Sequence, residues 1–187
     1  MKNKIIFLSL FLMGAVVNSF SQQIIKKDAE IDAMVKEISV DSLAQNLNKL
    51  VSFGTRATLS NQSSSTKGIG AARAWILSRF NEYAKSSNGR LSAFIDTITY
   101  NADKRRVNRP IILGNVVATL KGTDPNDKRI FIISGHLDSR RSNDMDSVGD
   151  SPGANDDGSG TVAVMECARV MSKHSFPATL IFVTVSG

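Results

Sequence analysis

A histidine and two aspartates with the chemistry of metal ligands lie close together in the sequence. His136 and Asp138 stand where an apolar segment ends, and Asp156 opens the next segment of helical character. Zinc accepts neutral imidazole and carboxylate as ligands, and a carboxylate beside a histidine can fix its tautomer through the second ring N–H. The pattern indicates half of a metal site. By spacing alone, a hydrogen-bonded structural pair stays open as the alternative.

The segments around these residues predict an α/β fold. Helical periodicity and capping signals favour helices over residues 28–52, with a cap at Asp41-Ser42, and over 69–84 and 159–173; apolar runs between turn signals favour strands over 91–100, 111–120, 129–134 and 178–185. The last strand–loop–helix–strand succession is a βαβ unit, so its two strands should be parallel. Ligands bind beyond the carboxyl ends of such strands, where His136 and Asp156 would meet.

The first 21 residues have the layout of a secretory signal peptide. Lys2 and Lys4 precede an apolar core that ends before Ser19-Phe20-Ser21, a small-x-small cleavage site. The apolar core is shorter than the roughly 20 residues of a membrane span. We therefore expect export to the periplasm or beyond, without stable membrane insertion.

Composition excludes a nucleic-acid partner. The formal net charge is +6, of which Lys2 and Lys4 contribute two, so the remainder carries +4. The basic clusters at 104–106 and 140–141 have no interleaved aromatic residues of the kind that stack on bases. The sequence does not indicate an oligomeric state.

Five segments resemble one family of zinc enzymes. Residues 135–139, 152–160 and 176–187 carry the likeness, which extends to 115–122 and more loosely to 53–56. They resemble the co-catalytic zinc aminopeptidases, the secreted exopeptidases of metallopeptidase family twenty-eight. The resemblance implies a three-layer α/β fold with a mostly parallel or mixed sheet flanked by helices. It also implies removal of N-terminal residues from peptides with a free N-terminus, by a water that two Zn²⁺ ions activate.

The resemblance also implies residue roles. His136 would bind one zinc, Asp156 would bridge both, and Asp138 would orient His136. Asp157 receives no certain role and is interpreted as a loop or helix-start carboxylate. No residue is implied for another cofactor.

The family pattern continues beyond Ser186-Gly187 with a glutamate pair, which supplies the general base, and a later aspartate and histidine. None of these is present, so we expect residues 22–187 to be the N-terminal portion of a catalytic domain whose C-terminal half is missing, and to be inactive alone. We also expect strand 178–185 to lie at an exposed, aggregation-prone edge of the sheet.

Three alternatives stay open. A glutaminyl-cyclase-like relative would use one zinc, and a non-catalytic binding domain could occupy the same scaffold. Residues 144–155 imitate a calcium loop, but Val148 occupies a ligand position and Asn155 replaces the final glutamate.

Overall fold

The computed structural model describes residues 27–103 and 105–186, and the expected signal peptide lies outside these residues. The helices are α2 (Ala29–Lys36), α3 (Val40–Val51), α4 (Gly68–Ala84) and α5 (Ser159–Met171), with a short π-helix η1 (Ala154–Gly158); the strands are β1 (Leu91–Tyr100), β2 (Ile111–Leu120), β3 (Ile130–His136) and β4 (Thr179–Val185). Within the described residues, no helix combines the length and apolar character that crossing a membrane requires. Among the described residues, those from Ala33 onward form a compact unit that contains the whole sheet, and residues 27–32 belong to a separate unit.

The four strands form one mixed sheet in the order β1-β2-β4-β3. β1 and β2 form an antiparallel hairpin, β2 and β4 are antiparallel, and β3 and β4 are parallel, as the βαβ pattern predicts. The expectation that residues 178–185 form an edge strand is wrong, because β4 lies between β2 and β3. The edges of the sheet are β1 and β3.

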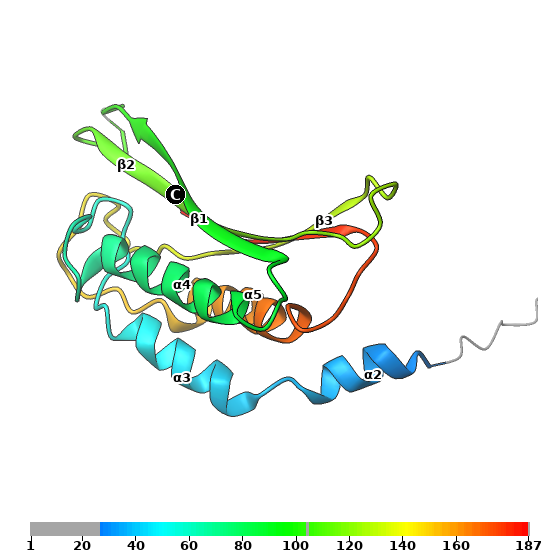
Figure 1. The fold of residues 1–187 in the computed structure, drawn as a ribbon. Helices are drawn as coiled ribbons and strands as arrows, with labels where there is room; N and C mark the ends of the chain where they lie inside the picture. Colours follow the sequence, from blue (N-terminus) through cyan, green and yellow to red (C-terminus); the bar gives the residue numbers. More distant parts are fainter. Residues whose placement is uncertain (1–26, 104, 187) are drawn as a thin grey trace, which may run out of the picture. The chain divides into compact units, whose positions relative to one another are not determined.

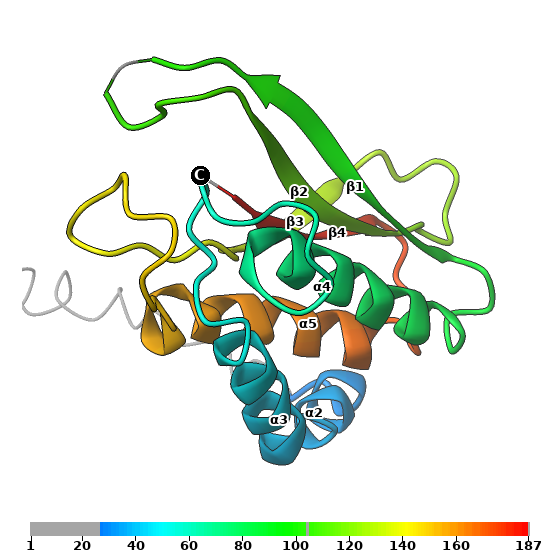
Figure 2. The ribbon, with the colours of Figure 1, turned by 90° about the vertical axis from the view of Figure 1, so that its left-hand side faces the viewer.

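Helices α3, α4 and α5 lie on one side of the sheet (Figures 1 and 2). α4 packs against β1 and β2, α5 packs against β3 and β4, and α3 packs against α5. Apolar side chains repeat along each strand with a period of two on this side, because successive side chains point to opposite faces. The buried cluster at the centre includes Ile76, Phe80, Val116, Leu137, Met165 and Phe182.

The opposite face of the sheet exposes apolar side chains. Phe94 and Ile98 on β1 and Ile130 and Ile132 on β3 are all more than half exposed. All four side chains lie on this face, because residues paired across neighbouring strands point to the same side of the sheet, as Ile132 and its β4 partner Ile181 do. The described residues thus supply the sheet and one helical layer of the flanked α/β fold.

The region 28–52 is two helices, where the sequence predicts one. The break at residues 37–39 follows from a contact far away in the sequence, since the Glu166 carboxylate accepts the Ser39 N–H at 2.7 Å. Ser39 caps α3 by accepting the Ser42 N–H at 3.1 Å, so the predicted cap at Asp41-Ser42 is wrong. The two helices therefore meet at a short segment that is attached to α5.

Gly135 allows β3 to approach the first turn of α5. A Cβ at this position would lie 2.7 Å from the Gly160 carbonyl carbon, closer than backbone atoms allow. We expect Gly135→Ala to lower the free energy of unfolding by about 1–3 kcal/mol, since strand or helix must shift. Ser134→Ala, at an exposed site on the same strand, is the control. Chemical denaturation measures both, and equal stabilities would contradict this close-packing argument.

Candidate metal centre

His136 is the last residue of β3 and its backbone is held from two sides. Its N–H donates to Asp157 Oδ2 at 2.9 Å, and its carbonyl accepts the Thr161 hydroxyl at 2.9 Å. The next residue, Leu137, donates its N–H to Val185 O at 2.8 Å. β3 ends two residues beyond the predicted strand, so the histidine belongs to the sheet and its position follows from strand pairing.

Asp138 lies against the histidine ring. Its Oδ1 is 3.2 Å from His136 Nδ1, and its side chain is largely buried. A carboxylate only accepts, so a proton on Nδ1 would complete this contact, and with a metal bound the lone pair would lie on Nε2. The arrangement matches a metal-binding histidine oriented by a carboxylate.

Asp156 approaches the other ring nitrogen. Its Oδ1 lies 3.0 Å from His136 Nε2, while the rest of the carboxylate faces solvent and the side chain is 89% exposed. η1 is irregular here, since Asp156 has extended dihedral angles of φ −111° and ψ 101°. That local extension directs the carboxylate toward the end of β3. The structure thus brings together all three residues that the sequence singles out, and their individual roles stay predictions.

Asp157 is a helix-start carboxylate, in line with the interpretation from the sequence. Its Oδ1 accepts the Gly160 N–H at 2.9 Å in the first turn of α5, and its Oδ2 accepts the His136 N–H. The helix N-terminus favours a negative charge at this place. One carboxylate therefore joins β3 to α5 and fixes the spacing between His136 and Asp156.

Arg56 holds both halves of the site and has no role in the sequence-based assignment. Its side chain is fully buried. Nε donates to Leu137 O at 2.7 Å, and Nη1 donates to Pro152 O at 2.7 Å and to Leu50 O at 3.2 Å. Nη2 donates to Gly153 O at 3.0 Å. The guanidinium thus connects the segment of His136 and Asp138 to the segment that leads into Asp156.

The surroundings of Arg56 act on its charge in opposite directions. Burial lowers the pKa of the guanidinium from its ordinary value, while the negative charges of Asp138 and Asp157 raise it. An arginine pKa is high enough for the charge to persist at neutral pH. The charges of Asp138 and Asp157 therefore offset part of the cost of burying the Arg56 cation.

The residues present fit part of a zinc site. Two donors on one tetrahedral zinc, each at a bond length of about 2.1 Å, would lie roughly 3.4 Å apart, and the His136 Nε2–Asp156 Oδ1 separation of 3.0 Å is close to that. Across residues 27–103 and 105–186, no three His, Cys, Asp or Glu side chains gather in a cluster suited to a metal. His136 and Asp156 would therefore hold zinc together with ligands from elsewhere.

Sequence comparison supports the family resemblance. Residues 115–187 match Peptidase family M28. A probable zinc metalloprotease of Leptosphaeria maculans is 45% identical over 160 residues, which cover 86% of this chain and 37% of that protein. Leucine aminopeptidase 1 of Fusarium vanettenii is 28% identical over 159 residues, which cover 85% of this chain and 36% of that protein. The chain spans about a third of the length of these curated relatives.

Solved structures share the fold. The LapA aminopeptidase of Legionella pneumophila superposes with a TM-score of 0.61 at 24% identity, over 88% of this chain and 41% of that one. The glutaminyl cyclase of Fimbriiglobus ruber superposes with a TM-score of 0.60 at 16% identity, over 80% of this chain and 46% of that one. The mixed sheet and its layer of helices are therefore a fold that this chain shares with these two proteins.

Arg56 offers a test of how the site is held. Arg56→Lys keeps a charge but cannot reach four carbonyl groups, and we expect it to lower the free energy of unfolding by about 2–5 kcal/mol, because buried acceptors lose their donors. The control is Arg129→Lys, since the Arg129 side chain is 68% exposed and such surface changes stay within about 0.5 kcal/mol. Denaturant unfolding measures both variants. Wild-type stability in Arg56→Lys would contradict the assignment.

Proposed function

We propose that this chain, which resembles the zinc peptidases of family M28 over the N-terminal part of their length, forms part of an exported aminopeptidase that uses two zinc ions. The observation that carries the proposal is the convergence of His136 Nε2 and Asp156 Oδ1, with Asp138 on the opposite ring nitrogen. The family match and the zinc metalloprotease relatives support zinc as the metal. The aminopeptidase relative supports peptides with a free N-terminus as substrates.

In this proposal His136 would hold one zinc through Nε2, and Asp156 would be the ligand that the two ions share, as the family resemblance implies. Bound zinc supplies Lewis-acid polarisation of the substrate carbonyl and a nucleophilic water at neutral pH. Asp138 holds the Nδ1 proton of His136, so the ring offers its lone pair at Nε2 without losing orientation. Asp157 and Arg56 fix the two backbones from which these ligands project. The general base would come from residues other than those described.

A glutaminyl-cyclase-like enzyme is the second candidate, because glutaminyl cyclases share the fold. The two candidates differ in metal number, since the family resemblance pairs one zinc with the cyclase and two with the peptidase. Metal analysis of the whole protein together with assays on a peptide beginning with leucine and a peptide beginning with glutamine separates them. Absence of both activities would favour a non-catalytic binding domain.

Export is also part of the proposal. Residues 1–21 have the signal-peptide layout described above. Expression with its own leader should yield protein outside the cytoplasm with a new N-terminus close to residue 22, which N-terminal sequencing detects. An intact Met1 on exported protein would contradict cleavage.

Substitutions at the candidate ligands test the proposal directly. In the whole protein, His136→Ala or Asp156→Ala should abolish hydrolysis of an aminoacyl anilide and lower the zinc content, because each removes a metal ligand. Asp138→Asn should reduce activity or zinc affinity about 10–100-fold, as losses of groups that orient a ligand do. Steady-state kinetics and elemental analysis provide the two measurements.

Asp146→Asn is a matched control on the neighbouring loop. Asp146 pairs with Arg141, and it has no place in the proposed site, so activity and zinc content should stay at the wild-type level. Full activity of Asp156→Ala would refute the bridging role, whatever the result for His136.

The chain by itself should not catalyse. Its described residues offer His136 and Asp156 as donors, which are too few for a zinc pair. We expect no measurable aminopeptidase activity from the 187 residues with added zinc, in an assay where the whole protein turns over. Zinc-dependent turnover by the short chain would overturn this ligand count.

A further inference from the structure

The chain leaves the sheet beside the candidate metal centre. Val185, the last residue of β4, pairs with His136, and its carbonyl accepts the Leu137 N–H at 2.8 Å. Ser186 follows directly, and it lines a pocket of about 310 Å³ together with Asp138. The segment that continues from β4 therefore starts at the same end of the sheet as the candidate ligands.

A side chain replaces backbone pairing where β4 separates from β2. The last paired residues are Val116 and Thr184, and continuing this register would place Ser186 opposite Gly114. Instead, the Ser186 hydroxyl donates to Gly114 O at 2.8 Å and accepts the Gly114 N–H at 3.2 Å. One hydroxyl thus makes both hydrogen bonds that the backbone of a directly paired residue would make. It keeps the Ser186 backbone one side chain away from β2.

Asn115 holds the Ser186 backbone itself. Its Oδ1 accepts the Ser186 N–H at 3.0 Å, which satisfies a backbone donor beyond the end of the ladder. Gly114 and Asn115 are fixed in turn, because they pair with Thr97 and Asp96 of β1. Three hydrogen bonds from one segment of β2 therefore set the position of Ser186, and with it the direction in which the chain continues.

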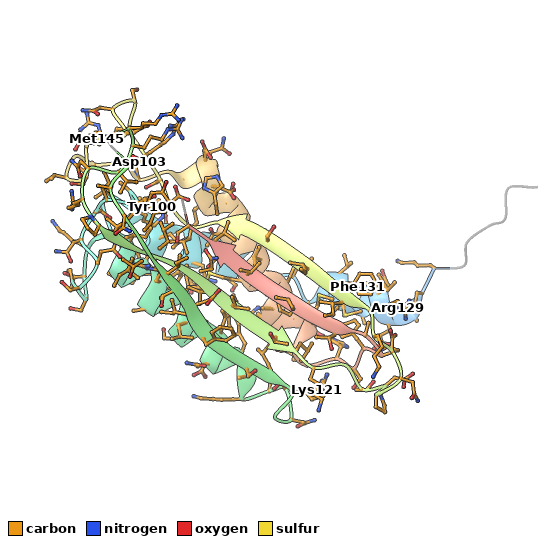
Figure 3. The ribbon with its side chains drawn as sticks, turned by 90° about the horizontal axis from the view of Figure 1, so that it is seen from above. Tyr100, Asp103, Lys121, Arg129, Phe131 and Met145 are labelled. Carbon is orange, nitrogen blue, oxygen red and sulfur yellow. The ribbon has the colours of Figure 1, made fainter. Side chains whose placement is uncertain are left out.

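The opposite end of β4 has a comparable contact that is remote from the metal centre. The Thr179 hydroxyl accepts the Gly122 N–H at 3.2 Å and so attaches the start of β4 to the chain that follows β2. This contact lies about 20 Å along the strand from the end that pairs with His136. Figure 3 shows the two ends of the sheet, with Tyr100 at the one near the metal centre and Lys121 at the other.

We infer that Ser186 and Asn115 are positioning residues, which direct the segment that follows β4 into the candidate metal centre. The inference rests on the proposed aminopeptidase function, whose general base and remaining zinc ligands come from outside residues 27–103 and 105–186. A rotation of the backbone at Ser186 moves every side chain after it. Because a general base must lie within hydrogen-bond reach of the proton that it removes, a displacement of about 1 Å lowers the rate about 100-fold.

Two substitutions of equal shape test the hydroxyl in the whole protein. Ser186→Thr keeps the hydroxyl, whereas Ser186→Val has a methyl group in its place. With leucine anilide and saturating zinc, we expect kcat of Ser186→Val to fall about 10–100-fold. KM should change little, because the base is displaced while substrate binding is retained. Ser186→Thr should keep most of the wild-type kcat.

Thr179→Val is the matched control, because it removes a hydroxyl that attaches the distant end of the same strand. It should lower the midpoint of chemical denaturation, as Ser186→Val does, but leave kcat at the wild-type level.

Asn115→Ala is a second variant, and its control is Thr119→Ala, four residues along the same face of β2. Asn115→Ala should lower kcat as Ser186→Val does. Amide hydrogen exchange at Ser186 should become faster in Asn115→Ala and stay unchanged in Thr119→Ala, and equal exchange would contradict the anchoring. If Ser186→Val does not fold, as circular dichroism reports, this second pair decides in the same way.

The failures of the inference and of the proposed function differ. A wild-type kcat in Ser186→Val overturns the positioning role and leaves the aminopeptidase function standing. Equal losses of kcat in Ser186→Val and Thr179→Val overturn it as well, because both losses would then follow from a weaker sheet. If the wild-type whole protein does not hydrolyse leucine anilide, the proposed function is refuted, and the inference fails with it.

Discussion

The candidate metal centre depends on one buried cation. Arg56 is fully enclosed, and its guanidinium donates to carbonyl groups of segments that lie 6, 81, 96 and 97 residues away in sequence. A charge without partners in such a place would be very costly. Here the four carbonyl dipoles and two nearby carboxylates compensate it. The same bonds satisfy backbone acceptors in loops that cannot pair in a sheet, so the loops are defined although they have no regular structure.

The site is consequently held through backbone groups more than through contacts between its own side chains. Gly153 has a left-handed backbone with φ of 46°, and a Cβ there would lie 2.6 Å from Ser139 Cβ. Ser139 in turn bonds the backbone of Arg56 and Ser151. These contacts bring the loops before and after His136 within reach of one guanidinium. Only after this do the exposed carboxylate of Asp156 and the imidazole of His136 meet.

The sequence predicts what is local and misses what is distant. Strands 91–100 and 111–120 are confirmed to the residue, since each is a clear apolar or alternating run between turn signals. The βαβ unit and the meeting of His136, Asp138 and Asp156 follow from the rule that carboxyl ends of parallel strands share an edge. The sequence does not predict that β4 lies inside the sheet, because its pattern does not show whether β2 pairs with β3 or with β4. The sequence does not reveal the roles of Ser39 and Arg56. The partner of Ser39, Glu166, lies far along the chain, and the partners of Arg56 are backbone carbonyl oxygens, which every residue type carries.

The strand order also has a consequence for the sequence of events during folding. The β1–β2 hairpin joins neighbours in the chain, whereas pairing of β2 with β4 brings Leu120 beside Leu180 across an intervening segment that contains β3 and α5. Pairings between distant segments form slowly, because the chain loses loop-closure entropy before the new contacts lower its free energy. His136 receives its neighbour Val185 only when β4 has entered the sheet. We therefore expect the hairpin to form early and the paired end of β3 to be among the last parts to become rigid, so that a metal-binding geometry appears only in chains that have completed the central strand.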